Sequence, residues 1–333
     1  MKVCYLIGNL KMNKTREEII PYLKKLDKLS KKTGNIVGVC LPSIHIGLAE
    51  KLRYTCYGTQ NVYFEEKGAY TGELSVAMLE SYGCHLCLVG HSERRQLFGE
   101  TDDSVNKKVK AIVAGPVTPI ICVGETLKER EAGQTKKIIK NQIEKAVKGL
   151  SLEDVEKCWF AYEPVWAIGS GKSATSEDAE NVISYIKQII IKKYPEIKDR
   201  RIVVLYGGSL NEKNCRELLS QPSIDGGLIG GACLDIRKFE KIINTKIEED
   251  CMKDKKVKLC KNEKCGKKTV KKLITKDMTI GDVLAIKPEA AAVFMGFGMH
   301  CFSCPISSME TLEEAAQVHG ADLDLMLQKL NEL

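Results

Sequence analysis

The sequence lacks the features that mark membrane and secreted proteins. None of its apolar runs approaches the roughly 20 residues that a membrane-spanning helix needs. The first residues, "MKVCYLIGNLKMNK", turn polar too soon for a secretory signal. The 14 cysteines are scattered without the framework of a small disulfide-bonded domain, so most are expected to be buried thiols in a reducing cytosol. We therefore expect a cytoplasmic protein.

Net charge is spread unevenly along the 333 residues. Residues 246–273 contain 11 lysines and 5 acids, and residues 274–333 contain 3 lysines and 9 acids, so residues 1–245 carry the whole of the formal net charge of +7. A basic domain favours anionic substrates. The lysine-rich stretch has no interleaved aromatic residues, which favours a solvated linker over a nucleic-acid-binding segment. We expect a large domain over 1–247, a Lys/Cys-rich linker over 248–273, and a small domain over 274–333.

The large domain alternates short apolar runs with amphipathic stretches that have a helical period, and in the longest stretch, residues 127–150, a break is expected at Gly133. This alternation predicts parallel strands with helical crossovers, and eight units in about 245 residues are typical of a closed (β/α)8 barrel. A doubly wound open sheet is the structural alternative. The eight runs cover residues 3–9, 35–42, 55–61, 85–91, 118–124, 157–164, 201–209 and 226–231.

The stretch "AYEPVWAIGSGKSAT" (161–175) contains Gly-Lys-Ser but is not a nucleotide-binding P-loop. A P-loop needs a glycine five residues before that motif's own glycine, and Trp166 stands there. Gly169, Gly171 and Ala174 fit G-x-G-x-x-A, a pattern that is weak on its own. Two interpretations remain at this point, a surface loop with hinge glycines and a lid behind the carboxylate of Glu163.

Polar residues follow the predicted strands at the end where the active sites of such barrels lie. Taken singly, each has an ordinary structural explanation, but together they favour a functional site. Glu163 is the candidate carbon base, and His91 is able to polarise a carbonyl. Glycine pairs after the last two strands let backbone N–H groups approach a phosphate. With no metal-ligand spacing at this rim, the set predicts metal-free proton transfer beside a carbonyl of a phosphorylated substrate. Its members are Asn9, Lys11, His91, Ser92, Glu93, Glu163, the stretch "GGS" at 207–209, Gly230 and Gly231.

Seven ordered motifs resemble the triosephosphate isomerase family over residues 2–244. They are "GNLKMN", "QNVYFEEKGAYTGELS", "VGHSERR", "CVGE", "AYEPVWAIGSGKSAT", "YGGS" and "GLIGGACL". The resemblance implies a glycolytic and gluconeogenic isomerase of this fold that interconverts dihydroxyacetone phosphate and D-glyceraldehyde 3-phosphate, with no cofactor. It departs from the family at Leu10, where tryptophan is usual, and this bears on packing and not on chemistry.

The resemblance also implies a role for each matching residue. Glu163 is the base, His91 the neutral electrophile, and residues 164–174 a closing loop that retains the phosphate. Its first hinge is residues 164–166 and its second hinge is residues 172–174. Thr71, in "GAYTGE", belongs to a loop that enters a partner subunit, so a homodimer is expected. Lys11 stabilises the enediolate, Asn9 binds the substrate oxygens, Glu93 pairs with Lys11 or steadies the site, and Gly171, Ser209, Gly230 and Gly231 supply phosphate donors.

The last 60 residues predict a small domain of short helices with a C-x-x-C motif at Cys301 and Cys304. The first helix is expected to start at Asp277 or Thr279, another to end at Gly320, and the last to be capped by Asp322. This spacing fits a redox pair, half of a metal site, or two buried helix cysteines. Cys260 and Cys265 could complete a four-thiolate site, although their spacing makes this the weaker branch. "HCFSCP" and "ETLEEAAQVHG" resemble redox-disulfide domains associated with hybrid-cluster proteins. The alternative function is a barrel that serves as scaffold for such a module.

Overall fold

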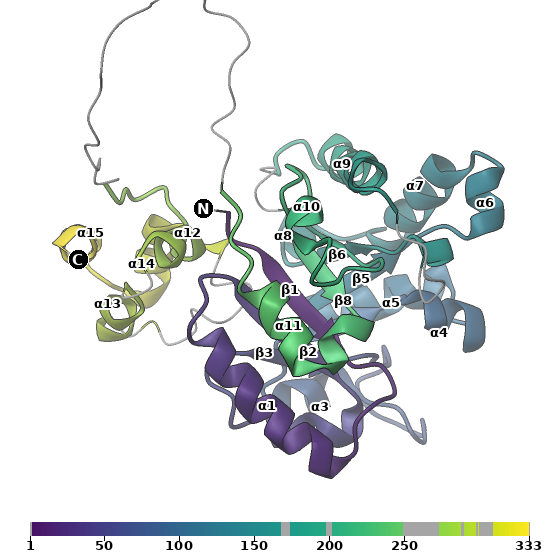
Figure 1. Cartoon of the computed structure of the whole chain (residues 1–333), viewed down its shortest axis with the longest axis horizontal. Helices are drawn as coiled ribbons and strands as arrows, with labels where there is room; N and C mark the ends of the chain where they lie inside the picture. The colour runs from purple at the N-terminus through teal and green to yellow at the C-terminus, as the bar shows by residue number, and fades with distance from the viewer. Residues whose placement is uncertain are drawn as a thin grey trace, which may run out of the picture.

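A computed structural model contains a closed barrel of eight parallel strands in the order β1 to β8, with helices around it (Figure 1). The barrel predicted from the alternating runs is thereby confirmed, and the open sheet is excluded. Each strand lies inside one of the eight apolar runs. The strands are β1 (Tyr5–Asn9), β2 (Ile36–Leu41), β3 (Cys56–Thr59), β4 (Leu86–Val89), β5 (Thr118–Val123), β6 (Trp159–Tyr162), β7 (Val203–Tyr206) and β8 (Gly226–Ile229). The structure describes residues 2–167, 174–197, 202–248, 273–287, 290–297, 299 and 309–332.

Helices of the barrel begin at side chains that accept hydrogen bonds from otherwise unpaired backbone N–H groups. Thr101 and Thr126, for example, cap α5 and α6 in this way. The predicted break at Gly133 is present, because this residue has φ +68° and separates α6 from α7. The helices are α1 (Arg16–Ser30), η1 (Ser43–His45), α2 (Ile46–Ala49), α3 (Val76–Ser81), α4 (Ser92–Leu97), α5 (Asp102–Val113), α6 (Leu127–Glu131), α7 (Thr135–Ala146), α8 (Leu152–Glu156), η2 (Val165–Ala167), α9 (Ser176–Lys193), α10 (Cys215–Leu219), η4 (Gly231–Leu234) and α11 (Ile236–Ile243).

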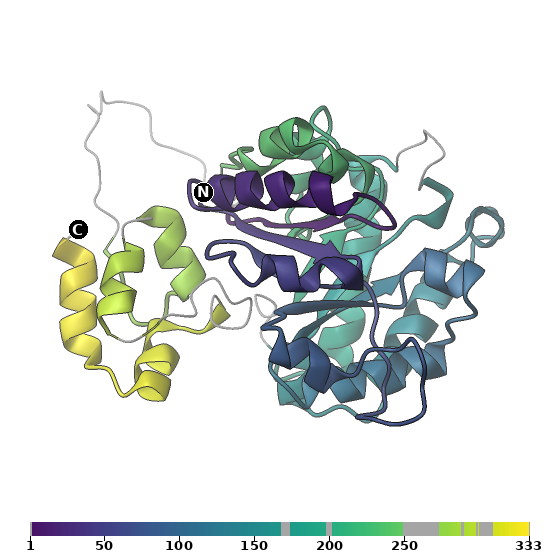
Figure 2. The same ribbon diagram turned by 90° about the horizontal axis from the view of Figure 1, so that it is seen from below.

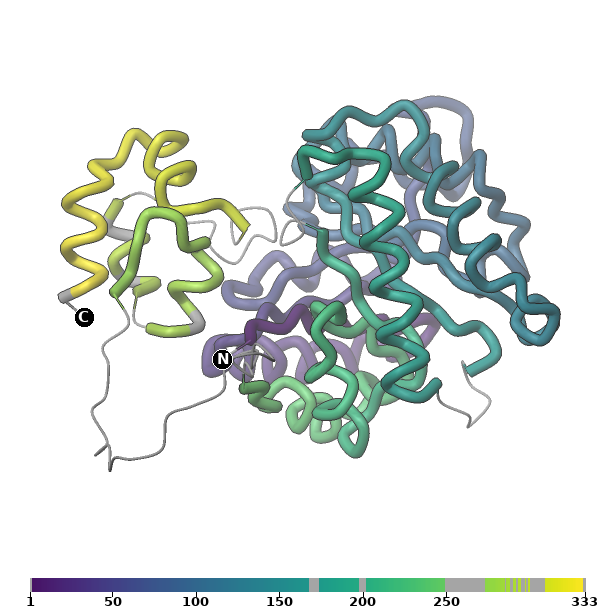
Figure 3. Tube along the Cα trace, turned by 90° about the horizontal axis from the view of Figure 1, so that it is seen from above, coloured from purple at the N-terminus to yellow at the C-terminus, as the bar shows by residue number. Residues whose placement is uncertain are grey.

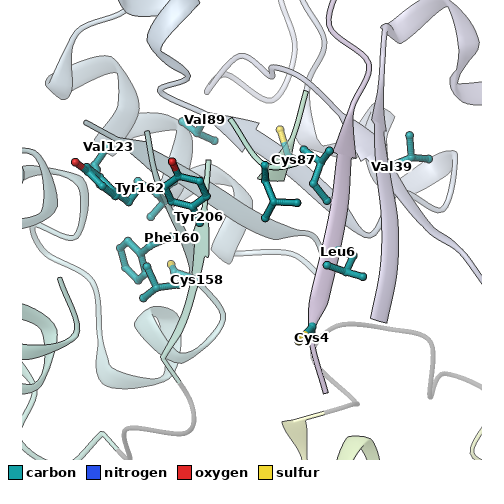
Figure 4. Packing of buried hydrophobic residues seen from close by; sticks show 14 of the residues in the cluster. Cys4, Leu6, Val39, Cys87, Val89, Val123, Cys158, Phe160, Tyr162 and Tyr206 are labelled. Atoms are coloured by element: carbon teal, nitrogen blue, oxygen red, sulfur yellow. The ribbon is translucent and has the colours of Figure 1, made fainter. Parts of the chain in front are cut away.

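Two apolar clusters follow from the alternation of side chains along each strand. Leu6 and Val39 belong to the outer cluster, which includes residues of both the strands and the surrounding helices (Figure 4). Ile7, one residue after Leu6, belongs to the inner cluster, to which all eight strands contribute. The interior of the barrel is therefore a packed core, and polar chemistry is confined to its ends.

The tail forms a separate small unit beside the barrel, at the end where β1 begins (Figures 2 and 3). Its described residues form the helices α12 (Ile280–Ile286), α13 (Ala290–Gly296), α14 (Leu312–His319) and α15 (Leu323–Glu332) around a core of its own. Three predicted boundaries are found: Thr279 caps α12, Gly320 ends α14 in a left-handed conformation, and Asp322 accepts a hydrogen bond from Leu325 N.

Several predicted features lie outside the described residues, among them Gly171 and the cysteines at 260, 265, 301 and 304. An all-helical tail therefore stays a prediction. In the part of the chain that the structure describes, no helix combines the length and the apolar character needed to cross a membrane.

Candidate active site

A cavity of about 500 Å³ opens at the carboxyl ends of the strands. It brings together residues that are up to 225 positions apart in the sequence, from Asn9 to Leu234, because parallel strands all end at this face. Of the residues predicted for the barrel's site, Thr71 is not among the lining, and Gly171 lies outside the described residues. Those that line it are Asn9, Lys11, His91, Glu93, Glu163, Ser209, Gly230 and Gly231.

Glu163 directly follows β6 and is 2% exposed. Its Oε2 accepts a hydrogen bond from the backbone N–H of Ser92 at 2.8 Å, and its Oε1 lies 2.9 Å from His91 Nε2. Burial raises the pKa of this carboxyl, but the His91 ring and the Ser92 N–H outweigh burial, and the net pKa lies below its ordinary value. Two hydrogen-bond donors thus keep the carboxylate ionised and hold it in this resting position.

His91 stands at the N-cap of α4, where its Nδ1 accepts a hydrogen bond from Glu93 N at 3.2 Å. A backbone N–H only donates, so Nδ1 must offer its lone pair, and the neutral ring carries its proton on Nε2. That proton points to Glu163. Burial lowers the pKa of His91, whereas the Glu163 carboxylate raises it, and the net direction is upward while the two side chains touch.

Lys11 extends over the same cavity from the segment after β1. Its Nζ pairs with Glu93 Oε1 at 2.5 Å, one of the two arrangements expected for Glu93. The Lys11 backbone has φ +51°, an uncommon conformation for a residue other than glycine. Its N–H donates to Asn9 Oδ1, and its carbonyl accepts from Gln60 Nε2, each at 3.0 Å. These bonds hold the ammonium group and the Asn9 amide in fixed relative positions.

The opposite wall of the cavity is backbone. Gly207, Gly208 and Ser209 follow β7, and Gly230 and Gly231 follow β8. Asn214 Nδ2 donates to the Ser209 carbonyl at 2.8 Å and fixes the first segment. A Cβ added at Gly231 would meet no atom within 4 Å, so this backbone borders open space.

The residues after Glu163 form the 3-10 helix η2, which includes two of the three residues predicted as the first hinge of the loop. Trp166 Nε1 and Tyr162 OH each donate to Glu125 Oε1 at 3.0 Å. The Arg130 guanidinium lies 4.4 Å from the centre of the Trp166 ring. Lys172 and Ser173 of the second hinge lie outside the described residues, and Ala174 is buried.

Sequence reasoning missed several residues that matter to this geometry. Glu125 is the main one: it is fully buried, and its Oε2 has no hydrogen-bond partner among the described residues. The motif "CVGE" ends in this residue, and an acid placed directly after a strand was the available signal. The cavity lining also includes Asn13, Gln96 and Asn211, for which the sequence carried no comparable signal.

Comparisons with known proteins agree on the barrel. The family model described as triosephosphate isomerase matches residues 4–246, and a second model, described as a domain of unknown function (DUF1858), matches residues 274–327. The chain is 43% identical over 247 residues to triosephosphate isomerase of Endomicrobium trichonymphae, which covers 73% of this chain and 98% of that protein. It is 46% identical over 240 residues to that of Acetivibrio thermocellus, covering 71% and 95%.

A solved structure is similar as well. The crystal structure of triosephosphate isomerase from Bartonella henselae superposes with a TM-score of 0.65 at 32% identity, covering 72% of this chain and 97% of that one. The curated relatives correspond to the barrel alone, because each is matched over almost its whole length by residues that end before the tail.

Proposed function

The chain belongs to the triosephosphate isomerase family of enzymes, and from this premise we propose that it interconverts dihydroxyacetone phosphate and D-glyceraldehyde 3-phosphate through an enediolate. The observation that carries the proposal is the contact of Glu163 with His91 in a cavity whose other walls are the Lys11 ammonium group and glycine-rich backbone. A base, a proton donor, a cation and a phosphate cradle meet in one place.

In the proposed mechanism, the Glu163 carboxylate takes a proton from one substrate carbon and returns it to the neighbouring carbon. It first has to leave Ser92 N and His91 Nε2, which hold it in the resting arrangement. This departure frees the Nε2–H of His91 to donate to the substrate oxygens. It also removes the carboxylate that raises the pKa of His91, so the ring stays neutral. Triosephosphate isomerase is the standard illustration of a glutamate base that works beside a neutral histidine.

The remaining groups bind charge. Lys11 lies where it would stabilise the negative charge of the enediolate, and Asn9 would bind the substrate oxygens. Ser209, Gly230 and Gly231 would donate backbone N–H groups to the phosphate, joined by Gly171 when the loop closes. Closure would exclude water and hold the phosphate, because an enediolate that meets water loses phosphate by elimination.

An isomerase assay on the purified full chain tests this proposal. We expect turnover of both triose phosphates, unaffected by prior treatment with EDTA. Activity that EDTA abolishes and a divalent metal restores would contradict the mechanism. The alternative, a barrel that serves only as scaffold for the tail, predicts no turnover above the level of a Glu163→Gln variant.

We also propose a homodimer. A second cavity of about 350 Å³ lies beside Lys11, and the nearby apolar side chains of Met12 and Ile44 are 95% and 84% exposed. Large exposed apolar side chains are typical of a contact surface. Thr71 is exposed on its own loop, which suits insertion into the same cavity of a partner across a two-fold axis. Sedimentation at assay concentrations tests this, and a fully active monomer would refute it.

For the tail, we propose a dispensable accessory domain with a redox or metal-binding role at Cys301 and Cys304. The barrel holds every proposed catalytic residue, and its relatives lack a matched tail, so a chain that ends after residue 248 should remain an active isomerase. Mass spectrometry of oxidised and reduced full-length chain, with metal analysis, tests the role. If neither a disulfide nor bound metal is found, the cysteines are structural. A metal shared with Cys260 and Cys265 is the less favoured outcome.

A further inference from the structure

Two aromatic side chains, Tyr5 and Trp159, lie at the amino-terminal end of the barrel, opposite the catalytic cavity. We call this end the amino-terminal mouth. Tyr5 opens β1 and Trp159 opens β6, and their rings meet edge to face with centroids 4.7 Å apart. Trp159 belongs to the inner cluster of the barrel, and the partly buried Tyr5 packs against that cluster. One further side chain packs there from outside the barrel: Met309, in the tail.

Backbone hydrogen bonds fix the segment that carries Met309 to the rest of the tail. The backbone of the residues after it is bonded to the segment before α12: Ile280 N donates to Glu310 O at 2.9 Å, and Leu312 N donates to Met278 O at 2.9 Å. An antiparallel bridge between Thr279 and Thr311 joins the same two segments. The methionine is therefore held on the folded core of the tail without being a member of it.

The barrel chain also ends at this mouth. Lys2 N donates to Ile247 O at 2.9 Å, which places the last described residues of the barrel chain beside the start of β1. Lys2 Nζ donates to the carbonyls of Leu219, Gln221 and Ile224, of which the last lies just before β8. The described part of the barrel chain thus ends on the side of the barrel where the tail lies (Figures 1 and 3).

Charge favours the same contact. Residues 1–245 carry a formal charge of +7, and residues 274–333 carry −6, counted over their lysines, arginines and acids. Opposite net charges attract over distances up to the Debye length, about 10 Å at 0.1 M salt, and steer the two units together. Methionine suits the contact itself, because its unbranched thioether adapts to irregular gaps and is attracted to aromatic rings.

From these observations we infer that the tail docks on the amino-terminal mouth of the barrel, where Met309 packs against the aromatic rings. This docking stabilises the barrel without obstructing the catalytic cavity. The occupant of this docking surface is a segment of the same chain. The inference is independent of the reaction, because Tyr5, Trp159 and Met309 do not line the catalytic cavity.

The test compares full-length Met309→Asp with two controls. Val318→Asp places the same acid on a side chain of the tail that is 71% exposed, and Met309→Leu keeps an apolar side chain at the mouth. For Met309→Asp we expect a larger radius of gyration by X-ray scattering and a melting temperature lower by about 2–4 °C, the shift that a loss of about 1 kcal/mol gives in a domain of this size. In a Trp166→Phe background, which leaves Trp159 as the sole tryptophan, the emission should shift to the red. Both controls should match the parent chain, and in chains that keep Trp166 the isomerase kcat/KM should be unchanged by each of the three substitutions.

The inference is overturned if Met309→Asp and Val318→Asp give the same radius, emission and melting temperature. A second measurement does not depend on a disruptive variant. A photo-crosslinking residue at position 309 should join peptides that contain Tyr5 or Trp159. Crosslinks confined to the tail would refute the docking even if Met309→Asp failed to fold.

Discussion

Replacing Glu163 with glutamine removes the proposed base while keeping its shape. The carboxylate accepts two hydrogen bonds, from Ser92 N at 2.8 Å and from His91 Nε2 at 2.9 Å. The amide of glutamine has one oxygen and one NH2 group, so it satisfies one of these donors and faces the other with a second donor. Since the site is buried, we expect Glu163→Gln to lower the free energy of unfolding by about 1–3 kcal/mol.

The effect on catalysis should be larger than the effect on stability. General base catalysis contributes roughly 10²–10⁴-fold, and at the upper end about 5 kcal/mol of transition-state stabilisation is lost. Because the phosphate-binding backbone is untouched, the loss should fall on kcat and leave the affinity for inorganic phosphate within about twofold, a change below 0.5 kcal/mol. A coupled assay in both directions measures kcat, and calorimetric titration with phosphate measures binding.

Glu163→Asp is the matched control. It keeps the charge but withdraws the carboxylate by one methylene, and a displacement of about 1 Å costs on the order of 10²-fold. The expected order of activity is therefore parent, then Asp, then Gln. Glutamine activity equal to or above that of aspartate, or a Glu163→Gln variant that loses phosphate binding and not kcat, would refute the assignment of Glu163 as the base.

Three further predictions concern the same region. The folded-state pKa of Glu163 lies below the ordinary 4.5, so the stability it contributes is present above that pH and is lost as the pH falls through the lowered pKa; the gap in melting temperature between parent and Glu163→Gln should close over that acid range. A Cβ at Gly124 would lie 1.8 Å from the Glu163 carbonyl oxygen, so Gly124→Ala should lower either kcat or the yield of folded protein at least tenfold. A tenfold change corresponds to about 1.4 kcal/mol. Gly47→Ala is the control and should change neither quantity, because an added Cβ there has its nearest contact at 3.5 Å. Trp166→Phe removes one of the donors to the buried Glu125 and should cost about 1.5–3 kcal/mol in chemical denaturation; an unchanged midpoint would show that this bond does not support the hinge.

Much of the barrel was predictable from the sequence because its signals are local. Each strand is a short apolar run, and several helices begin at a Ser or Thr that caps them, so residues a few positions apart determine where elements begin and end. The break at Gly133 is of the same kind. The rim residues were found because every parallel strand of a barrel ends at the same face. A polar residue directly after an apolar run is therefore expected at that face.

The tertiary structure decided what depends on contacts between distant segments. The bond from Ser92 N to Glu163 joins residues 71 positions apart, and no local pattern encodes its direction. The same holds for Glu125, whose carboxylate is bonded to Tyr162 and Trp166, 37 and 41 positions away. Met309 is the clearest case: as a sequence position it is an ordinary apolar residue shortly before a capping threonine, and only the tertiary structure packs it against the inner cluster of the barrel. Periodicity specifies which side of an element is apolar, whereas the packing partner of that side is selected by the shape and burial of the assembled fold.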